Sequence, residues 1–168
     1  MAGLNLPQPL NANHVRENFD CGRAALNTWF QRRAWHNQQA DVSRTSVVCD
    51  SISHKVAGFV SLSATQVERA WLLKAHQRNQ PDPLPAILLG QLAVDLRYQG
   101  RGYSKSLMLY ALTTAVRLSQ DIGCYCVLTH PLDEGVREFY RNFGFDDLPY
   151  DPARSMAVRI IDLKKSGF

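Results

Sequence analysis

A nearly continuous apolar run, "AILLGQLAV" at 86–94, restricts the fold of this chain more than any other feature. A strand of that composition is typical of the middle of a sheet whose two faces are both covered. After a polar loop with two glycines, residues 104–119 repeat apolar side chains at the 3.6-residue period of an amphipathic helix. The next apolar stretch, 124–130, has the pattern of a strand. Because a helix between two strands favours a parallel pair, we predict a β-α-β unit.

The flanking patterns add helices and a hairpin to this unit. Residues 45–50 and 55–67 read as two strands across the short turn "SISH", with alternating polarity in the second. We further expect a helix at 22–38 capped by Asp20, a short helix and an ordered loop over 68–84, a helix at 133–143 and a closing strand at 156–163. The proline-rich "RNQPDPLP" is expected to form neither helix nor central strand. The predicted fold class is α/β (α+β), a mixed central β-sheet flanked by helices, in a single domain over 1–168.

Composition excludes several classes of protein. The net charge of +4 is a mild excess of basic residues, and it fits either a solvated surface or a face that binds phosphate. No Cys-x-x-Cys pair is present among the four cysteines, so we expect reduced thiols and no metal site. The N-terminus lacks the pattern of a signal peptide, and no apolar run is long enough to span a membrane. We therefore expect a cytoplasmic protein without a membrane partner.

The loop after the apolar strand has the features of an anion site. Gly100 and Gly102 let the backbone approach a ligand closely, and Arg101 adds a positive charge. The N-terminus of the following helix supplies unpaired N–H groups and a favourable dipole. A tight strand-to-helix turn explains the two glycines equally well when the loop is taken alone. The P-loop and the dinucleotide fingerprint are both excluded, because neither spacing is matched.

Two motifs together resemble the GNAT acetyltransferases. Arg97, Gly100 and Gly102 match the pattern [QR]xxGx[GA], and "REFYRNFGF" at 137–145 resembles the second signature of that family. The resemblance implies a GNAT fold that binds acetyl-CoA as co-substrate. In that family the glycine loop holds the pyrophosphate and the preceding strand holds the pantetheine arm. The residues implied here are Leu92, Ala93, Val94, Gln99, Gly100, Arg101, Gly102, Tyr103 and Ser104.

A narrower resemblance covers nearly the whole chain. The segments "WFQRRAWHNQQADVSRTSVV" and "RNQPDPLPAILLGQLAVD" are similar to the acetyltransferase toxins of bacterial toxin–antitoxin pairs, the TacT and AtaT group. That likeness implies acetylation of the amino acid on charged tRNA, a homodimer, and a small DNA-binding antitoxin of the ribbon-helix-helix type. Tyr103 and Ser104 depart from the small residues common at these positions, and the loop "DDLPYDPARS" looks individual. The substrate amino acid therefore does not follow from the resemblance.

Tyr140 is the candidate general acid that the resemblance implies. A phenol and a thiol have comparable pKa values, so a proton can pass to the departing thiolate. Periodicity alone favours core packing for Tyr140, because it shares a helix face with Val136 and Phe139. No carboxylate lies near the middle of the apolar strand to act as a base, which favours an α-amine substrate over a lysine side chain. His130 is a reserve base, although we favour a strand-end hydrogen bond for it.

Basic residues suggest where a tRNA would bind. The candidates are Arg32, Arg33, His36, Arg44 and Arg78. Such a cluster is attractive to phosphate, and it favours tRNA over a small amine. Two other functions stay open at this point: a GNAT enzyme that acetylates a small amine or a protein N-terminus, and a catalytically inactive GNAT fold that serves as a binding module.

Overall fold

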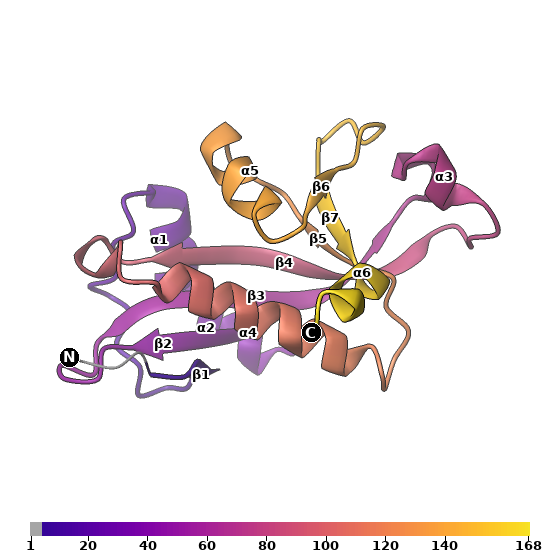
Figure 1. Cartoon of the computed structure of the whole chain (residues 1–168). Coiled ribbons are helices and arrows are strands. Elements are labelled where there is room, and N and C mark those ends of the chain that lie inside the picture. Colours follow the sequence, from indigo (N-terminus) through magenta and orange to yellow (C-terminus); the bar gives the residue numbers. More distant parts are fainter. Residues whose placement is uncertain (1–4) are drawn as a thin grey trace. The chain divides into compact units, whose positions relative to one another are not determined.

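The structure is a computed structural model that describes residues 5–168 (Figure 1). Its chain divides into two compact units. Unit 1 comprises the described residues up to Ser63 together with Gly90–Ala111, and unit 2 comprises Ala64–Leu89 and Leu112–Phe168. The single domain predicted over 1–168 stays a prediction, and its residues 1–4 lie outside the described part of the chain.

Unit 1 contains strands in the order β1-β2-β3-β4, and β1–β2 and β2–β3 pair antiparallel. The predicted hairpin at 45–67 is confirmed by the register, in which Val47 lies opposite Phe59. Strands β3 and β4 and helix α4 also continue into unit 2. The elements are β1 (Gln8–Pro9), α1 (Ala24–Arg32), α2 (Ala34–Gln39), β2 (Arg44–Cys49), β3 (Val56–Val67), β4 (Leu84–Val94) and α4 (Tyr103–Leu118), with a 3-10 turn at Leu96–Tyr98.

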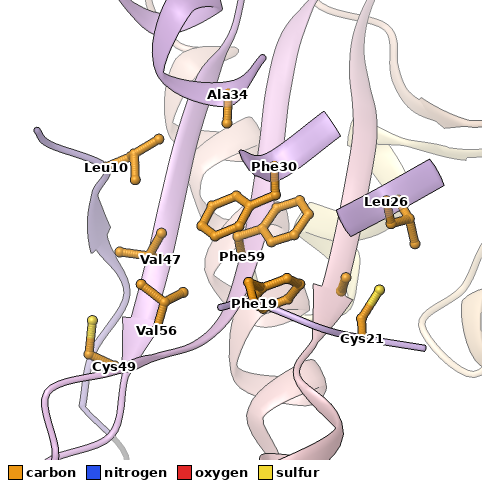
Figure 2. Close-up of a cluster of buried hydrophobic side chains, with 11 residues drawn as sticks. Leu10, Phe19, Cys21, Leu26, Phe30, Ala34, Val47, Cys49, Val56 and Phe59 are labelled. Carbon is orange, nitrogen blue, oxygen red and sulfur yellow. The ribbon is translucent and has the colours of Figure 1, made fainter. Parts of the chain in front are cut away.

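The core of unit 1 is built around three phenylalanines (Figure 2). The rings of Phe30 and Phe59 stack with centroids 4.3 Å apart, and Phe19 meets Phe30 edge to face at 4.9 Å. Leu26 and Phe30 lie four residues apart on α1, so both reach this core from one face of the helix. The core joins the N-terminal segment, α1 and the hairpin into one unit.

The predicted helix at 22–38 is two helices that meet at Arg33. Neither glycine nor proline marks this break, so the apolar period alone could not show it. Tertiary hydrogen bonds hold the second helix separately, because Gln38 donates to the Leu10 carbonyl and accepts from the Thr45 N–H. The predicted cap was also wrong: the N-cap is Arg23, and Asp20 instead accepts a side-chain bond from Asn27.

Unit 2 contains strands in the order β3-β4-β5-β7-β6. Strand β4 pairs parallel with β5, and β5 pairs antiparallel with β7, so the mixed sheet and the β-α-β unit are confirmed. Among the helices of residues 5–168, none is both long and apolar enough to cross a membrane. The remaining elements are α3 (Lys74–Gln77), β5 (Cys126–Thr129), α5 (Glu134–Arg141), β6 (Asp146–Asp147), β7 (Met156–Arg159) and α6 (Ile160–Lys165), with a 3-10 turn at Arg69–Trp71.

Two boundaries in unit 2 differ from the sequence prediction. The closing strand predicted at 156–163 ends at Arg159, because residues 160–165 form α6 with Ile160 and Leu163 buried at helical spacing. Arg159 braces this helix through two bonds to Asp162, of 2.8 and 3.0 Å. Strand β4 begins at Leu84, so the end of the proline-rich segment is strand after all. Pro85 has no N–H to donate, but its carbonyl accepts from the Tyr125 N–H at 2.8 Å.

Candidate active site

The glycine loop of unit 1 leads directly into the N-terminus of α4. Gly100 and Gly102 have φ angles of +76° and +86°, a region that side chains other than glycine rarely adopt. Gln99 anchors the start of the loop, because its Nε2 donates to the Val94 carbonyl at 3.0 Å. The first N–H groups of α4 have no acceptor within the helix, as at any helix N-terminus. The loop can therefore offer several N–H groups to one anion.

Asp95 organises this loop, although the sequence analysis did not single it out. Its side chain is 2% exposed and accepts from the backbone N–H groups of Asp20 and Arg97. The Arg97 guanidinium donates to both of its oxygens at 2.9 Å, so the first residue of the predicted motif braces the turn. The guanidinium groups of Arg97 and Arg101 both lie over the Tyr98 ring, 5.6 and 5.5 Å from its centroid. The sequence signal that could have identified Asp95 is its place two residues before Arg97, the first residue of the motif.

Asp95→Asn is expected to destabilise the protein by about 1–3 kcal/mol at neutral pH, because charge-assisted hydrogen bonds are lost. Burial raises the pKa of the Asp95 carboxyl, but the hydrogen bonds from Arg97 and Asp20 lower it below its ordinary value overall. A lowered pKa stabilises the fold above the unfolded-state value and stops doing so as the pH falls through the folded-state value. The deficit of the variant should therefore shrink below about pH 4. Urea unfolding at several pH values measures this.

The control for this prediction is Asp121→Asn, which removes an exposed carboxylate in unit 2. It should leave the free energy of unfolding within about 0.5 kcal/mol of the wild type. An Asp95→Asn deficit that is equally large at pH 3 and pH 7 would contradict a role for the ionised carboxylate.

The strand positions predicted to hold the pantetheine arm lie at the end of β4. Leu92 is half-buried, whereas Ala93 and Val94 are buried, with Ala93 in the aromatic core of unit 1. The Val94 carbonyl already accepts from Gln99. Their contribution to coenzyme binding would thus come from backbone groups, and it stays a prediction.

Tyr140 lies on α5 in unit 2 and is 6% exposed. Its ring meets Phe139 and Phe145 edge to face, with centroids 5.5 and 5.2 Å apart. Burial raises the pKa of the phenol, and a hydrogen bond with Thr129 opposes the rise. The phenol is therefore protonated at neutral pH and has a proton to give. The position of Tyr140 is compatible both with core packing, which its helix face suggested, and with the role of a proton donor.

Thr129 was not singled out from the sequence. It is buried and forms the last pair of the parallel ladder, opposite Leu89, to whose carbonyl its hydroxyl donates at 3.1 Å. The Thr129 hydroxyl also forms the hydrogen bond with the Tyr140 phenol that lowers the phenol pKa.

An ion network holds the loop between β6 and β7 against α5. Arg137, which is 5% exposed, donates to Asp147 at 2.6 Å and to the Arg154 carbonyl. Arg141 donates to the other oxygen of Asp147 at 3.1 Å, and Arg154 pairs with Glu134 at 3.2 Å. The loop that looked individual in sequence is therefore tied to the helix that carries Tyr140.

The predicted tRNA-binding residues do not all lie in one unit. Four are exposed on the segment from the end of α1 to the start of β2 in unit 1, and they are Arg32, Arg33, His36 and Arg44. Arg44 is engaged locally with Asp41 and with the Gln38 carbonyl. Arg78 is exposed in unit 2, at the end of α3. Within residues 5–168 no group of three or more His, Cys, Asp or Glu side chains is placed to hold a metal ion.

Comparisons with known proteins agree on one family. The model described as "Acetyltransferase (GNAT) family" matches residues 13–145. A curated relative from Mycobacterium tuberculosis, named tRNA-acetylating toxin, is 34% identical over 158 residues, which are 94% of this chain and 94% of the relative.

Two solved structures illustrate the structural likeness. AtaT complexed with acetyl-methionyl-tRNAfMet has a TM-score of 0.90 at 24% identity, over 99% of this chain and 100% of that one. A mutant AtaT toxin bound to the C-terminus of the antitoxin AtaR and acetyl-CoA has a TM-score of 0.83 at 22% identity, over 97% of both chains.

Proposed function

Because the chain belongs to the acetyltransferase (GNAT) family, we propose that it is a toxin that acetylates aminoacyl-tRNA. The acetyl group of acetyl-CoA passes to the α-amino group of the amino acid on the tRNA, and translation is blocked. The observation that carries this proposal is the full-length similarity to a tRNA-acetylating toxin. The confirmed fold class and the AtaT-like architecture support it.

The proposal assigns a role to one loop and to one tyrosine. In unit 1 the loop Gln99–Ser104 holds the coenzyme pyrophosphate through backbone N–H groups at the start of α4. In unit 2 Tyr140 gives a proton to the sulfur as the thioester bond breaks. Acetyl-CoA supplies the activated acyl group, and these residues supply binding and the proton.

The identity of the amine follows from what β4 lacks. Gly90 and Gln91 occupy the middle of this strand, and neither is a carboxylate. A lysine side chain, with a pKa of about 10.4, depends on a strong base, whereas an α-amino group titrates near 7.7–8.0. An α-amine is therefore the substrate that suits the strand.

The proposed partners follow from the same proposal. The enzyme acts where translation takes place, in the cytoplasm, as a homodimer that a small ribbon-helix-helix antitoxin neutralises. Support comes from a structural neighbour, AtaT, which is bound to the C-terminus of its antitoxin AtaR. Light scattering at micromolar concentration tests the dimer, and a monomer at that concentration would contradict it.

Mass spectrometry of total charged tRNA tests the function. After incubation with the protein and acetyl-CoA, we expect one or a few aminoacyl adducts to gain an acetyl group, and the masses identify the amino acid. Acetylated small amines or protein N-termini with unmodified tRNA would favour the alternative GNAT enzyme. No acetylated product and no coenzyme A release would favour an inactive binding module.

Replacing both Arg32 and Arg33 by Glu is expected to weaken tRNA binding and to lower its salt dependence. Both side chains are exposed at the junction of α1 and α2, free to reach phosphate. Each lost phosphate contact should reduce the slope of log K against log salt by about one. Filter binding over a salt series measures the slope, and calorimetry checks that acetyl-CoA still binds.

The matched control is the double change of Lys164 and Lys165 to Glu, an adjacent exposed pair in unit 2 with the same change of charge. If both double variants lose the same affinity, overall charge is responsible. An unchanged slope for the Arg32 and Arg33 variant means that tRNA docks elsewhere.

A further inference from the structure

His130 stands directly after β5 and is exposed, but its ring is held from one side. Its Nδ1 lies 2.8 Å from the Ser155 hydroxyl oxygen. The register of β5 and β7 pairs Thr129 with Met156. His130, which follows β5, and Ser155, which precedes β7, are therefore the next opposed residues. The strand-end hydrogen bond favoured from the sequence is therefore present.

Ser155 is fully buried and is itself tied to Asp151, which is 4% exposed. The Asp151 carboxylate accepts from the N–H groups of Ala153 at 2.9 Å and Ser155 at 3.0 Å, and from the Ser155 hydroxyl. Burial raises the pKa of this carboxyl, but these hydrogen bonds and the nearby His130 lower it overall. Asp151 is therefore a buried carboxylate that is ionised at neutral pH.

Counting protons gives the donor and the acceptor of each hydrogen bond that links His130, Ser155 and Asp151. The Ser155 hydroxyl has one proton, and Asp151, which is ionised, can only accept it. The Ser155 oxygen must then accept from His130, which places the neutral-ring proton on Nδ1. This leaves Nε2 with a free lone pair on an exposed ring. Asp151 is in electrostatic contact with His130, and the neighbouring Arg154 is paired with Glu134.

The position of His130 relates it to the candidate general acid. Thr129, the adjacent residue, makes the hydrogen bond with Tyr140. Acyl transfer needs a proton acceptor beside the attacking amine and a proton donor beside the leaving sulfur. Thr129 at the end of β5 contacts the donor Tyr140, and His130, the next residue, is the candidate acceptor.

We propose that His130 is the base that takes a proton from the α-ammonium group of the substrate, and that Ser155 and Asp151 position it. The proposal rests on the proposed function. The ammonium group loses one proton to Nε2, and its nitrogen then attacks the thioester carbonyl carbon. As the C–N bond forms and the C–S bond breaks, Tyr140 protonates the sulfur and the nitrogen loses a second proton. Of the two protons from nitrogen, one restores the Tyr140 phenol through solvent and the other is released to water.

The tautomer of His130 tests, without any substrate, whether Ser155 and Asp151 orient the imidazole ring. We expect ¹⁵N NMR of the neutral imidazole, at about pH 8, to show the proton on Nδ1. The His130→Gln variant assigns the signal among the five histidines of the chain. Ser155→Ala should shift the ring toward the Nε2-protonated form. A wild-type ring that carries its proton on Nε2 would overturn the proposal.

The pH dependence of the rate tests the base. We expect His130→Gln to lower the initial rate of coenzyme A release with total charged tRNA by about 10²-fold at pH 7. The deficit should shrink toward about pH 9, where the α-amine is already neutral. Asp151→Asn should lower the rate less than His130→Gln does. His54→Gln, the same change at an exposed turn position of unit 1, is the control and should change the rate less than twofold.

Failure of the proposal and failure of the proposed function are separable. If the wild type acetylates charged tRNA and His130→Gln matches it across the pH range, His130 is not the base. If the wild type leaves charged tRNA unmodified, the proposed function fails, and the same variants are then compared on whichever amine is acetylated. If no amine is acetylated, both fail.

Discussion

Tyr140→Phe is expected to lower turnover by about 10²–10⁴-fold and to leave acetyl-CoA affinity nearly unchanged. The variant keeps the ring, so the edge-to-face contacts with Phe139 and Phe145 persist, and only the proton donor is lost. Collapse of the tetrahedral intermediate then expels an unprotonated thiolate, which raises the barrier. Coenzyme A release measures turnover, and calorimetry with acetyl-CoA measures binding. If the protein is a toxin, expression of this variant should no longer arrest growth.

The fold itself should survive this change. Losing the hydrogen bond between Tyr140 and Thr129 leaves the Thr129 hydroxyl bound to the Leu89 carbonyl, so the free energy of unfolding should fall by only about 1 kcal/mol. Tyr125→Phe is the control, because it makes the same change in the same unit just before β5. Turnover of Tyr140→Phe within a few-fold of the wild type would leave Tyr140 a core residue only.

Gly100→Val is expected to abolish measurable acetyl-CoA binding while the protein stays folded. Apart from Gly100 itself and its two chain neighbours, no atom of residues 5–168 lies within 4 Å of the place where a Cβ on Gly100 would sit. The new side chain therefore meets no neighbour in the fold, but it occupies the space through which the pyrophosphate approaches the backbone. Calorimetry or equilibrium dialysis with acetyl-CoA measures the loss.

Backbone strain has to be separated from this effect, because Gly100 has a φ of +76°. Gly167 is a matched control: its φ is +97° and its Cβ position is also open within the described chain. Both variants should lose about 1–2 kcal/mol of stability from the left-handed backbone, but Gly167→Val should bind acetyl-CoA like the wild type. If Gly100→Val also binds acetyl-CoA normally, the loop is only a turn.

The order of the main elements could be predicted from local patterns. The apolar run at 86–94, the helix period after it and the next strand specify a parallel pair, because the connection between them is helical. Chain reversal at "SISH" likewise specifies the hairpin. Where the prediction failed, the pattern was ambiguous over a short range: "MAVRIIDL" is mostly apolar, as in a buried strand, but Ile160 and Leu163 are also spaced for a helix. Packing and the bond between Arg159 and Asp162 decided between the two.

The candidate site was predictable only where its chemistry depends on the backbone or on a motif. By themselves, the sequence patterns determined the β-α-β unit, the positions of the loop glycines, and the helix face that carries Tyr140, because glycine conformation and side-chain periodicity are local properties. Only the tertiary structure decided that Asp95 braces the loop, that Thr129 meets Tyr140, and that Asp151 and Ser155 orient His130. These contacts join residues whose spacing has no regular period. A buried carboxylate or hydroxyl generally forms hydrogen bonds, and the groups to which it bonds depend on how the strands are paired.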